Sequence, residues 1–108
     1  WTGLPAVLMG WIDRTLLPGA AFSVRPNGRV RGELHHIRSV VGVTPYGSPR
    51  SYRIVVGDGG KRMLRMVRGL CGLRCRFRWL ALDGMDGRSQ ADRTAFLSEV
   101  ERAMAGLR

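Results

Sequence analysis

Residues 73–80 read Leu73-Arg74-Cys75-Arg76-Phe77-Arg78-Trp79-Leu80. Charged and apolar side chains alternate strictly along this stretch, and successive side chains of a β-strand point to opposite faces. Arg74, Arg76 and Arg78 therefore line one face of a predicted strand that continues to Leu82. The other face carries Cys75, Phe77 and Trp79. The stretch predicts a half-buried strand with a cationic outer face.

A β-hairpin is predicted upstream of this strand. Residues 21–25 and 29–34 alternate in the same way, and Pro26-Asn27-Gly28 separates them. Asn-Gly between two alternating runs is a strong hairpin signal, because both central positions of the turn need positive φ. The inward side chains are predicted to be Phe22, Val24, Val30 and Leu34, and the outward ones Arg25, Arg29 and Arg31.

Two further strands are predicted between the hairpin and the opening stretch. Residues 37–43 form the first, and residues 51–56 form the second, with Tyr52, Ile54 and Val56 on one face. Residues 44–49 have the composition of a loop, and the glycines of residues 57–60 predict a turn.

Residues 61–68 fit two structures. Arg62, Arg65 and Arg68 recur every three residues, which is typical of a helix, while Met63, Arg65 and Val67 share a face if the segment is a strand. The glycine turn before the segment favours a strand that continues the meander. A helix would instead make a β-α-β crossover into the opening stretch.

A helix is predicted at each end of the chain. Apolar residues recur at helical spacing from Leu4 to Leu17, and Pro18-Gly19 ends that helix. Its apolar beginning also suits the last part of a membrane span. Ser89 is predicted to cap the second helix, with Asp92 at its third position. The apolar stripe of that helix is Phe96, Leu97, Val100, Ala103, Met104 and Leu107.

These elements predict an α+β fold: an antiparallel β-meander roll or partial barrel with a C-terminal helix and an N-terminal helical segment. Residues 1–19 are predicted to form the apolar helical segment. Residues 20–108 are predicted to form one basic meander domain with its closing helix. The length of 108 residues suits a single domain core.

The chain is strongly basic, with 18 Lys and Arg against 8 Asp and Glu and a net charge of +10. Of these bases only Lys61 is a lysine, and arginine suits phosphate and carboxylate groups. A domain this basic is expected to contact a polyanion. The predicted polyanion-binding residues are Arg74, Arg76, Arg78, Lys61, Arg62, Arg65, Arg29 and Arg31.

The sequence contains no catalytic motif, and we expect neither a metal site nor a cofactor. Gly57–Lys61 lacks the earlier glycine and the hydroxyl residue of a phosphate-binding loop. His35 and His36 are adjacent, so on a strand they point apart and do not share a metal. Cys71 and Cys75 are predicted to be small buried residues in a reducing compartment.

The order of these elements resembles bacterial pleckstrin-homology-like domains. The resemblance covers residues 20–107 and rests on four segments: the hairpin of residues 22–34, Ile37–Val40, Tyr52–Gly59 and the closing helix. It implies a strand meander bent into a roll and capped by a helix. Many such domains follow transmembrane helices, and they share no common ligand, so the resemblance implies no binding residue.

The expected function is that of a non-catalytic, basic binding module. It would act in the cytoplasm or at the cytoplasmic face of a membrane, bound to an anionic lipid surface or a membrane protein. The alternative is a nucleic-acid-binding protein or ribonucleoprotein subunit whose arginines contact phosphates. Among the aromatic residues only Tyr46 is predicted to be clearly exposed, and this weighs against stacking on single-stranded bases.

Overall fold

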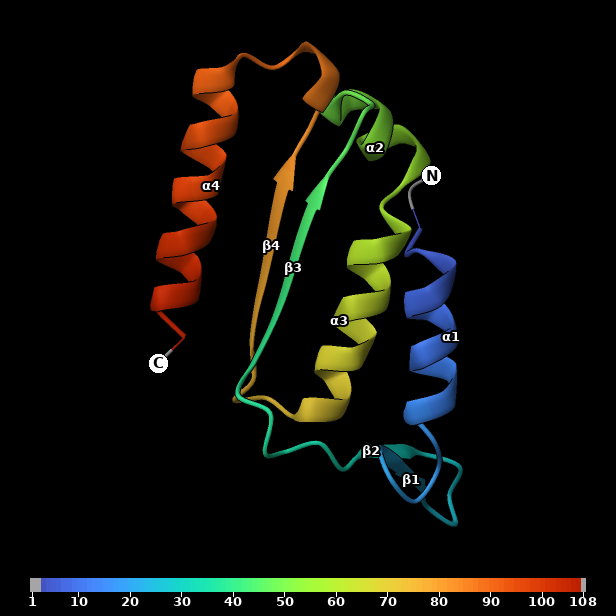
Figure 1. The fold of residues 1–108 in the computed structure, drawn as a ribbon. Helices are drawn as coiled ribbons and strands as arrows, with labels where there is room; N and C mark the ends of the chain where they lie inside the picture. Colours follow the sequence, from blue (N-terminus) through green and yellow to red (C-terminus); the bar gives the residue numbers. More distant parts are fainter. Residues whose placement is uncertain (1–2, 108) are drawn as a thin grey trace. The chain divides into compact units, whose positions relative to one another are not determined.

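The computed structural model describes residues 3–107 (Figure 1). The chain divides into two compact units. The first unit comprises residues up to Val40 and Asp58–Phe77, and the second comprises Val41–Gly57 and the residues from Arg78 onward. In chain order the elements are α1 (Ala6–Thr15), β1 (Phe22–Val24), β2 (Val30–Gly32), β3 (Ser39–Pro45), α2 (Arg50–Val56), α3 (Gly59–Cys71), β4 (Arg76–Leu82), the 3-10 turn η1 (Met85–Gly87) and α4 (Gln90–Ala105).

The first unit begins with α1 and a hairpin, and both predictions are confirmed. Strands β1 and β2 pair antiparallel, with Phe22 opposite Gly32. The backbone N–H of Arg25 donates to the carbonyl of Arg29 at 2.9 Å and closes the turn. Val24 and Val30 are predicted to face inward, but they are 60% and 61% exposed, because the turn end of the hairpin lies in solvent.

Helix α3 completes the first unit. The preference for a strand over residues 61–68 is wrong, and the helical alternative is confirmed. Asp58 caps the helix, since its carboxylate accepts a 2.9 Å hydrogen bond from the backbone N–H of Lys61. The glycines before Lys61 therefore belong to a helix start and not to a hairpin turn. Apolar residues at spacings of three and four then form one stripe along 13 residues, which only a helix can bury on one side.

The strand predicted over residues 51–56 is also wrong, because this segment is helix α2. Pro49 stands at its N-cap, where a missing N–H is harmless, and Gly57 ends it with a φ of 93°. No residue of α2 is buried, and Ile54 is 72% exposed. The β-branched run therefore marks no core strand here, and its β propensity is overridden by the surrounding structure.

Strands β3 and β4 form a two-stranded sheet and run parallel (Figure 1). Parallel neighbours need a long crossover connection, which α2 and α3 supply. The predicted antiparallel meander roll is therefore wrong, and the chain has an antiparallel hairpin and a β-α-β unit instead. Leu80 on β4 is 9% exposed while its neighbours Trp79 and Ala81 are half-buried. Burial on consecutive residues is typical of parallel strands.

Helix α4 lies beside β4 in the second unit (Figure 1). Its predicted start is confirmed: the Ser89 hydroxyl accepts from the Asp92 backbone N–H at 3.1 Å, and the Asp92 carboxylate accepts from the Ser89 backbone N–H at 3.1 Å. Of the predicted apolar stripe Ala103 is buried, but Leu97 and Met104 are 65% and 50% exposed. The buried stripe is therefore narrower than the sequence predicts.

Within residues 3–107, no helix is long and apolar enough to cross a membrane. The predicted division of the chain at residue 19 stays a prediction. Helix α1 clusters with the hairpin and α3 in one compact unit.

Candidate functional site

The loops that follow β3 and β4 are tied together at the carboxyl ends of the two strands. The backbone N–H of Met85 donates to the carbonyl of Tyr46 at 2.8 Å, and that of Gly84 donates to the carbonyl of Ser48 at 2.9 Å. A third bond, from the N–H of Tyr46 to the carbonyl of Leu82 at 2.8 Å, extends the sheet into the loops. These bonds fix two glycine-containing loops side by side.

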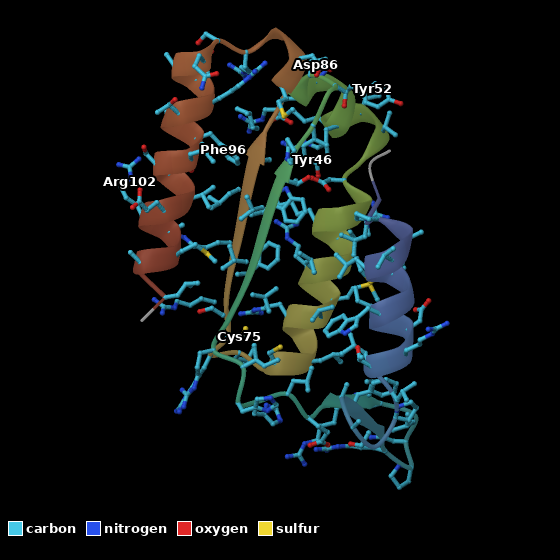
Figure 2. All side chains as sticks on the ribbon, in the orientation of Figure 1. Tyr46, Tyr52, Cys75, Asp86, Phe96 and Arg102 are labelled. Carbon is cyan, nitrogen blue, oxygen red and sulfur yellow. The ribbon has the colours of Figure 1, made fainter. Side chains whose placement is uncertain are left out.

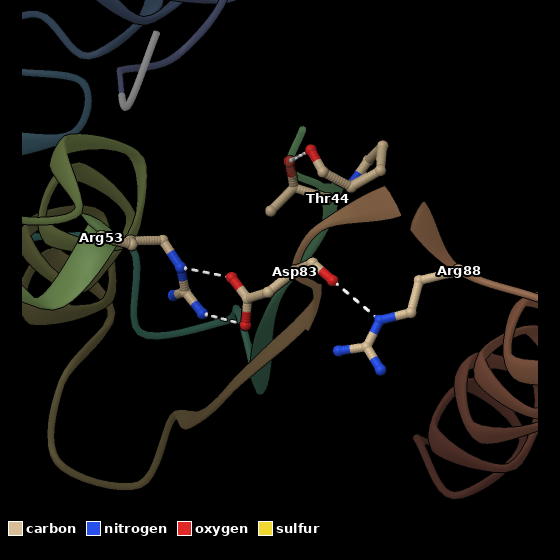
Figure 3. A network of polar contacts seen from close by, with 5 residues as sticks. Thr44, Arg53, Asp83 and Arg88 are labelled. Atoms are coloured by element: carbon tan, nitrogen blue, oxygen red, sulfur yellow. Dashed lines mark hydrogen bonds and ion pairs between the residues drawn. The ribbon is translucent and has the colours of Figure 1, made fainter. Parts of the chain in front are cut away.

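A bidentate ion pair supports this end of the sheet from α2 (Figure 3). The Arg53 guanidinium donates from Nε and Nη2 to the two carboxylate oxygens of Asp83, both at 2.9 Å. Each side chain of the pair is 12% exposed, so water screens the interaction weakly. The guanidinium also stands 4.6 Å from the ring centre of buried Tyr46. Arg53 thus joins the loop after β3 to the loop after β4.

Two arginines, Arg88 just before α4 and Arg93 in its first turns, also hold the second loop. Arg88 donates from Nε to the backbone carbonyl of Asp83 at 2.9 Å (Figure 3). Arg93 donates from Nη2 to the carbonyl of Met85 at 3.2 Å. Arg53, Arg88 and Arg93 therefore have structural roles, and none of the three was among the predicted site residues.

Polar groups surround the outer side of the two loops. Tyr52 and Asp86 lie at this end of the strands (Figure 2), and Tyr52 is 45% exposed. Gly47 is exposed, and a Cβ at this position would stand 3.3 Å from a carboxylate oxygen of Asp86. The exposed Asp86 side chain would have to give by a few tenths of an ångström to admit a Cβ there.

In open parallel sheets, ligands bind outside the carboxyl ends of the strands. The carboxyl ends of β3 and β4 have two joined loops, one bidentate ion pair and the exposed Tyr52, and this end of the sheet is the candidate site. The model of the family described as Flavodoxin-like fold matches residues 1–105. The chain belongs to the flavodoxin-like fold family.

No curated protein and no solved structure matches the chain significantly. The family match corrects the resemblance to pleckstrin-homology-like domains, which is wrong. That resemblance depended on reading residues 51–56 as a strand, and the segment is helical. The sheet of a flavodoxin-like fold is mostly parallel and its strands are connected through helices. In this chain β3 and β4 run parallel and are connected through α2 and α3 (Figure 1), as that fold predicts.

The predicted cationic face is only partly formed in this flavodoxin-like chain. Arg76 and Arg78 alternate with half-buried Phe77 and Trp79 on β4, as predicted. Arg74 lies in the turn before the strand, because Gly72 with a φ of 90° turns the chain there. The expected row of three arginines on one strand face is therefore wrong at its first member.

The other predicted polyanion-binding residues lie on α3 and the hairpin. Lys61, Arg62 and Arg65 belong to α3, so they do not form the predicted strand beside β4. Arg65 stands 5.7 Å from the ring centre of Phe77. Arg29 and Arg31 are exposed on the hairpin, and Arg31 lies 3.9 Å from the carboxylate of Glu33. Binding of a polyanion by any of these residues stays a prediction.

The two cysteines are buried and free, as predicted. Cys71 ends α3 and Cys75 precedes β4, and the Cys75 N–H donates to the carbonyl of Gly72 at 3.2 Å. Arg68 holds the same turn by donating from Nε to the carbonyl of Cys75 at 2.9 Å. Burial raises the pKa of the Cys71 thiol from 9.0 to about 11, and the neighbouring Cys75 thiol adds to the rise.

No cluster of three His, Cys, Asp or Glu side chains capable of holding a metal occurs among residues 3–107. His35 and His36 are both exposed in a turn. Tyr46 is predicted to be exposed, but it is buried. Sequence reasoning missed Tyr46, Arg53 and Asp83 as site residues. The signal that could have found them was a glycine-containing loop after each of two strands, and it points to a site only once the strands are known to be parallel.

Proposed function

We propose that the chain binds a flavin at the carboxyl ends of β3 and β4. The single observation that carries the proposal is the joining of the two loops there, by the bonds Met85 N–H to Tyr46 carbonyl at 2.8 Å and Gly84 N–H to Ser48 carbonyl at 2.9 Å. Parallel sheets of flavodoxin-like order place their mononucleotide in such a position.

The residues at this place fit a flavin mononucleotide. Arg50, Ser51 and Tyr52 are exposed at the start of α2 and offer a guanidinium and two hydroxyls to phosphate and carbonyl oxygens. The exposed ring of Tyr52 suits stacking on a flat heterocycle. Gly47 leaves the backbone of the first loop accessible. A bound flavin would supply hydride and single-electron transfer.

The proposal is tested by titrating flavin mononucleotide and riboflavin with the protein and measuring the quenching of flavin fluorescence. Tyr52→Ala is expected to weaken both ligands about three- to tenfold through lost stacking. Arg50→Gln is expected to weaken flavin mononucleotide by about the same factor and to leave riboflavin unchanged, because riboflavin has no phosphate.

Arg74→Gln is the matched control, because Arg74 is an exposed arginine in the turn before β4. It should bind both ligands like the unaltered protein. Failure of flavin mononucleotide to saturate the protein would reject the proposal. If Arg50→Gln and Arg74→Gln weaken the binding of flavin mononucleotide equally, the effect comes from net charge and not from a phosphate contact at Arg50.

A second function, contact with a polyanion, is favoured by the distribution of charge. The first unit contains eleven Lys and Arg and three Asp and Glu, a net charge of +8 out of +10. Three acidic side chains cannot neutralise eleven cationic ones, even though Glu33 lies 3.9 Å from Arg31. An anionic membrane surface and a nucleic acid both suit such a unit. The sequence-based expectation of a non-catalytic module stays a prediction.

A further inference from the structure

An apolar groove of about 270 Å³ lies in the first unit, and none of its lining residues belongs to the loops proposed to hold the flavin. Helix α1, the hairpin and α3 all contribute to it. Its lining residues are Ile12, Leu16, Phe22, Val30, Met63, Met66, Val67 and Leu70. We call this feature the apolar groove.

The lining fixes the chemistry of the part of a ligand that enters the groove. None of the eight side chains carries a nitrogen or oxygen atom, so a polar group placed there would lose its hydrogen bonds to water without replacement. Two methionines adapt their shape to an occupant more readily than branched side chains do. The volume is at the low end for ligand sites and suits one alkyl chain.

One cationic side chain, that of Arg62, stands at the border of the groove. Arg62 lies one residue before Met63 and one helical turn before Met66, so it stands at the edge of the apolar stripe of α3. Arg62 is exposed, and its guanidinium forms no ion pair or hydrogen bond within the part of the chain that the structure describes. The first unit as a whole has a net charge of +8.

The charge decides between the occupants that an apolar groove admits. A second copy of the chain would bring two units of net charge +8 together, and like charges oppose that contact. A nucleic acid has phosphates for Arg62, but its polar base edges do not suit the lining. We propose that the groove binds a single-chain anionic amphiphile, with the alkyl chain among the apolar residues and the headgroup at Arg62.

Calorimetric titration at low ionic strength and below the micelle concentration tests this proposal with two probes of equal chain length. Decanoate is expected to bind at one site, and decyltrimethylammonium is expected to bind at least about tenfold more weakly, because its headgroup meets a cationic border. Arg62→Gln should weaken decanoate about three- to tenfold. Met66→Glu, at a position 64% exposed and therefore tolerant of the change, should weaken it at least about tenfold.

Arg74→Gln is again the control, since it removes one positive charge from the same unit at a residue that does not line the groove. It should leave decanoate affinity within a factor of about two. The proposal is overturned if decanoate fails to bind, if both probes bind equally, or if Arg62→Gln and Arg74→Gln act alike.

Discussion

At the scale of single residues, arginine does two different things in this chain. Arg53, Arg68, Arg88 and Arg93 use their guanidinium groups to hold loops and turns, through carboxylate or carbonyl acceptors. Arg62 stands in solvent without such an acceptor among the described residues. The amino-acid composition does not distinguish these arginines, because they differ only in whether the guanidinium has an acceptor within the protein. An arginine-rich sequence therefore overstates the charge that is free to meet a ligand.

The Arg53–Asp83 pair is expected to stabilise the second unit. Asp83→Ala leaves a guanidinium that is 12% exposed without its carboxylate, and we expect a loss of about 2–4 kcal/mol in the free energy of unfolding. Urea denaturation of the single variants and of Arg53→Ala/Asp83→Ala measures the coupling. If the two residues interact, the double variant loses less free energy of unfolding than the two single variants lose together. A loss equal to that sum would contradict the interaction.

Cys71 is expected to make stability depend on pH at the alkaline end. Its pKa is raised from 9.0 to about 11 by burial, so the folded protein holds a proton that the unfolded chain releases. Stability is therefore complete below pH 9 and falls as the pH rises from 9 to 11. Urea midpoints across that range measure the loss, and Cys71→Ala should flatten the decline. A midpoint equally dependent on pH in both proteins would rule out Cys71 as the cause.

At the scale of elements, close packing of the hairpin on α3 depends on Gly32. The N–H of Leu34 donates to the carbonyl of Leu70 at 3.1 Å, so the end of the hairpin runs along the end of α3. A Cβ on Gly32 would overlap the backbone of Leu70. This contact between two backbones cannot be seen in the sequence, where Gly32 only interrupts an alternating run.

Gly32→Ala is expected to destabilise the protein by about 1–3 kcal/mol, because backbone must move to admit one methyl group. Gly69→Ala is the matched control, since a Cβ there meets nothing within 4 Å and α3 gains helix propensity. That control should be neutral or more stable by up to about 1 kcal/mol. Thermal unfolding of both variants distinguishes them, and equal effects would contradict the close approach.

The capping box of α4 is a second device at this scale. Ser89→Ala removes the hydroxyl acceptor of the Asp92 N–H, and we expect a loss of about 1 kcal/mol. The Ser89 hydrogen bonds also lower the pKa of Asp92, so the difference between the two proteins should shrink as acid protonates this carboxylate. Ser98→Ala, the same change in the middle of α4, should have little effect. A larger loss for Ser98→Ala would contradict the assignment of the cap.

The elements differ in how well the sequence predicts them. The hairpin, α1 and α4 carry local signals: Asn27-Gly28, Pro18-Gly19 and the Ser89–Asp92 box, and all three are found. Residues 51–56 carry a misleading signal, since Ile54, Val55 and Val56 favour strands but lie exposed in a helix. Alternation along one strand does not show whether the neighbouring strand runs parallel or antiparallel. The parallel pairing of β3 with β4, and with it the site at their carboxyl ends, therefore escaped prediction.

At the scale of the whole molecule, charge is unevenly distributed. The first unit has a net charge of +8 and the second has +2, although the second contains seven of the arginines. The first unit has eleven Lys and Arg against seven in the second, and the second has five Asp and Glu against three, so the bases account for most of the difference. The net charge of the chain is thus mainly a property of one unit.

Binding to heparin is expected to follow the first unit. Replacing Arg29, Arg31, Arg62 and Arg65 by Gln should lower the salt concentration of elution more than replacing Arg50, Arg78, Arg93 and Arg102, although both sets remove four charges. Circular dichroism is measured for each variant to check that it is folded. Equal displacement of the two sets would indicate that heparin responds to total charge alone.

Helix α3 faces two neighbours at once, and this makes its length invariant. Its apolar stripe lines the groove, while Arg68 reaches from another side to the carbonyls of Cys75 and Leu73. An inserted residue would rotate everything after it by about 100°, so both sets of contacts would be lost together. We therefore expect α3 to accept exchanged side chains more readily than an added or deleted position. The hairpin turn at Pro26-Asn27-Gly28, exposed on its outer side, is where this fold can vary in length.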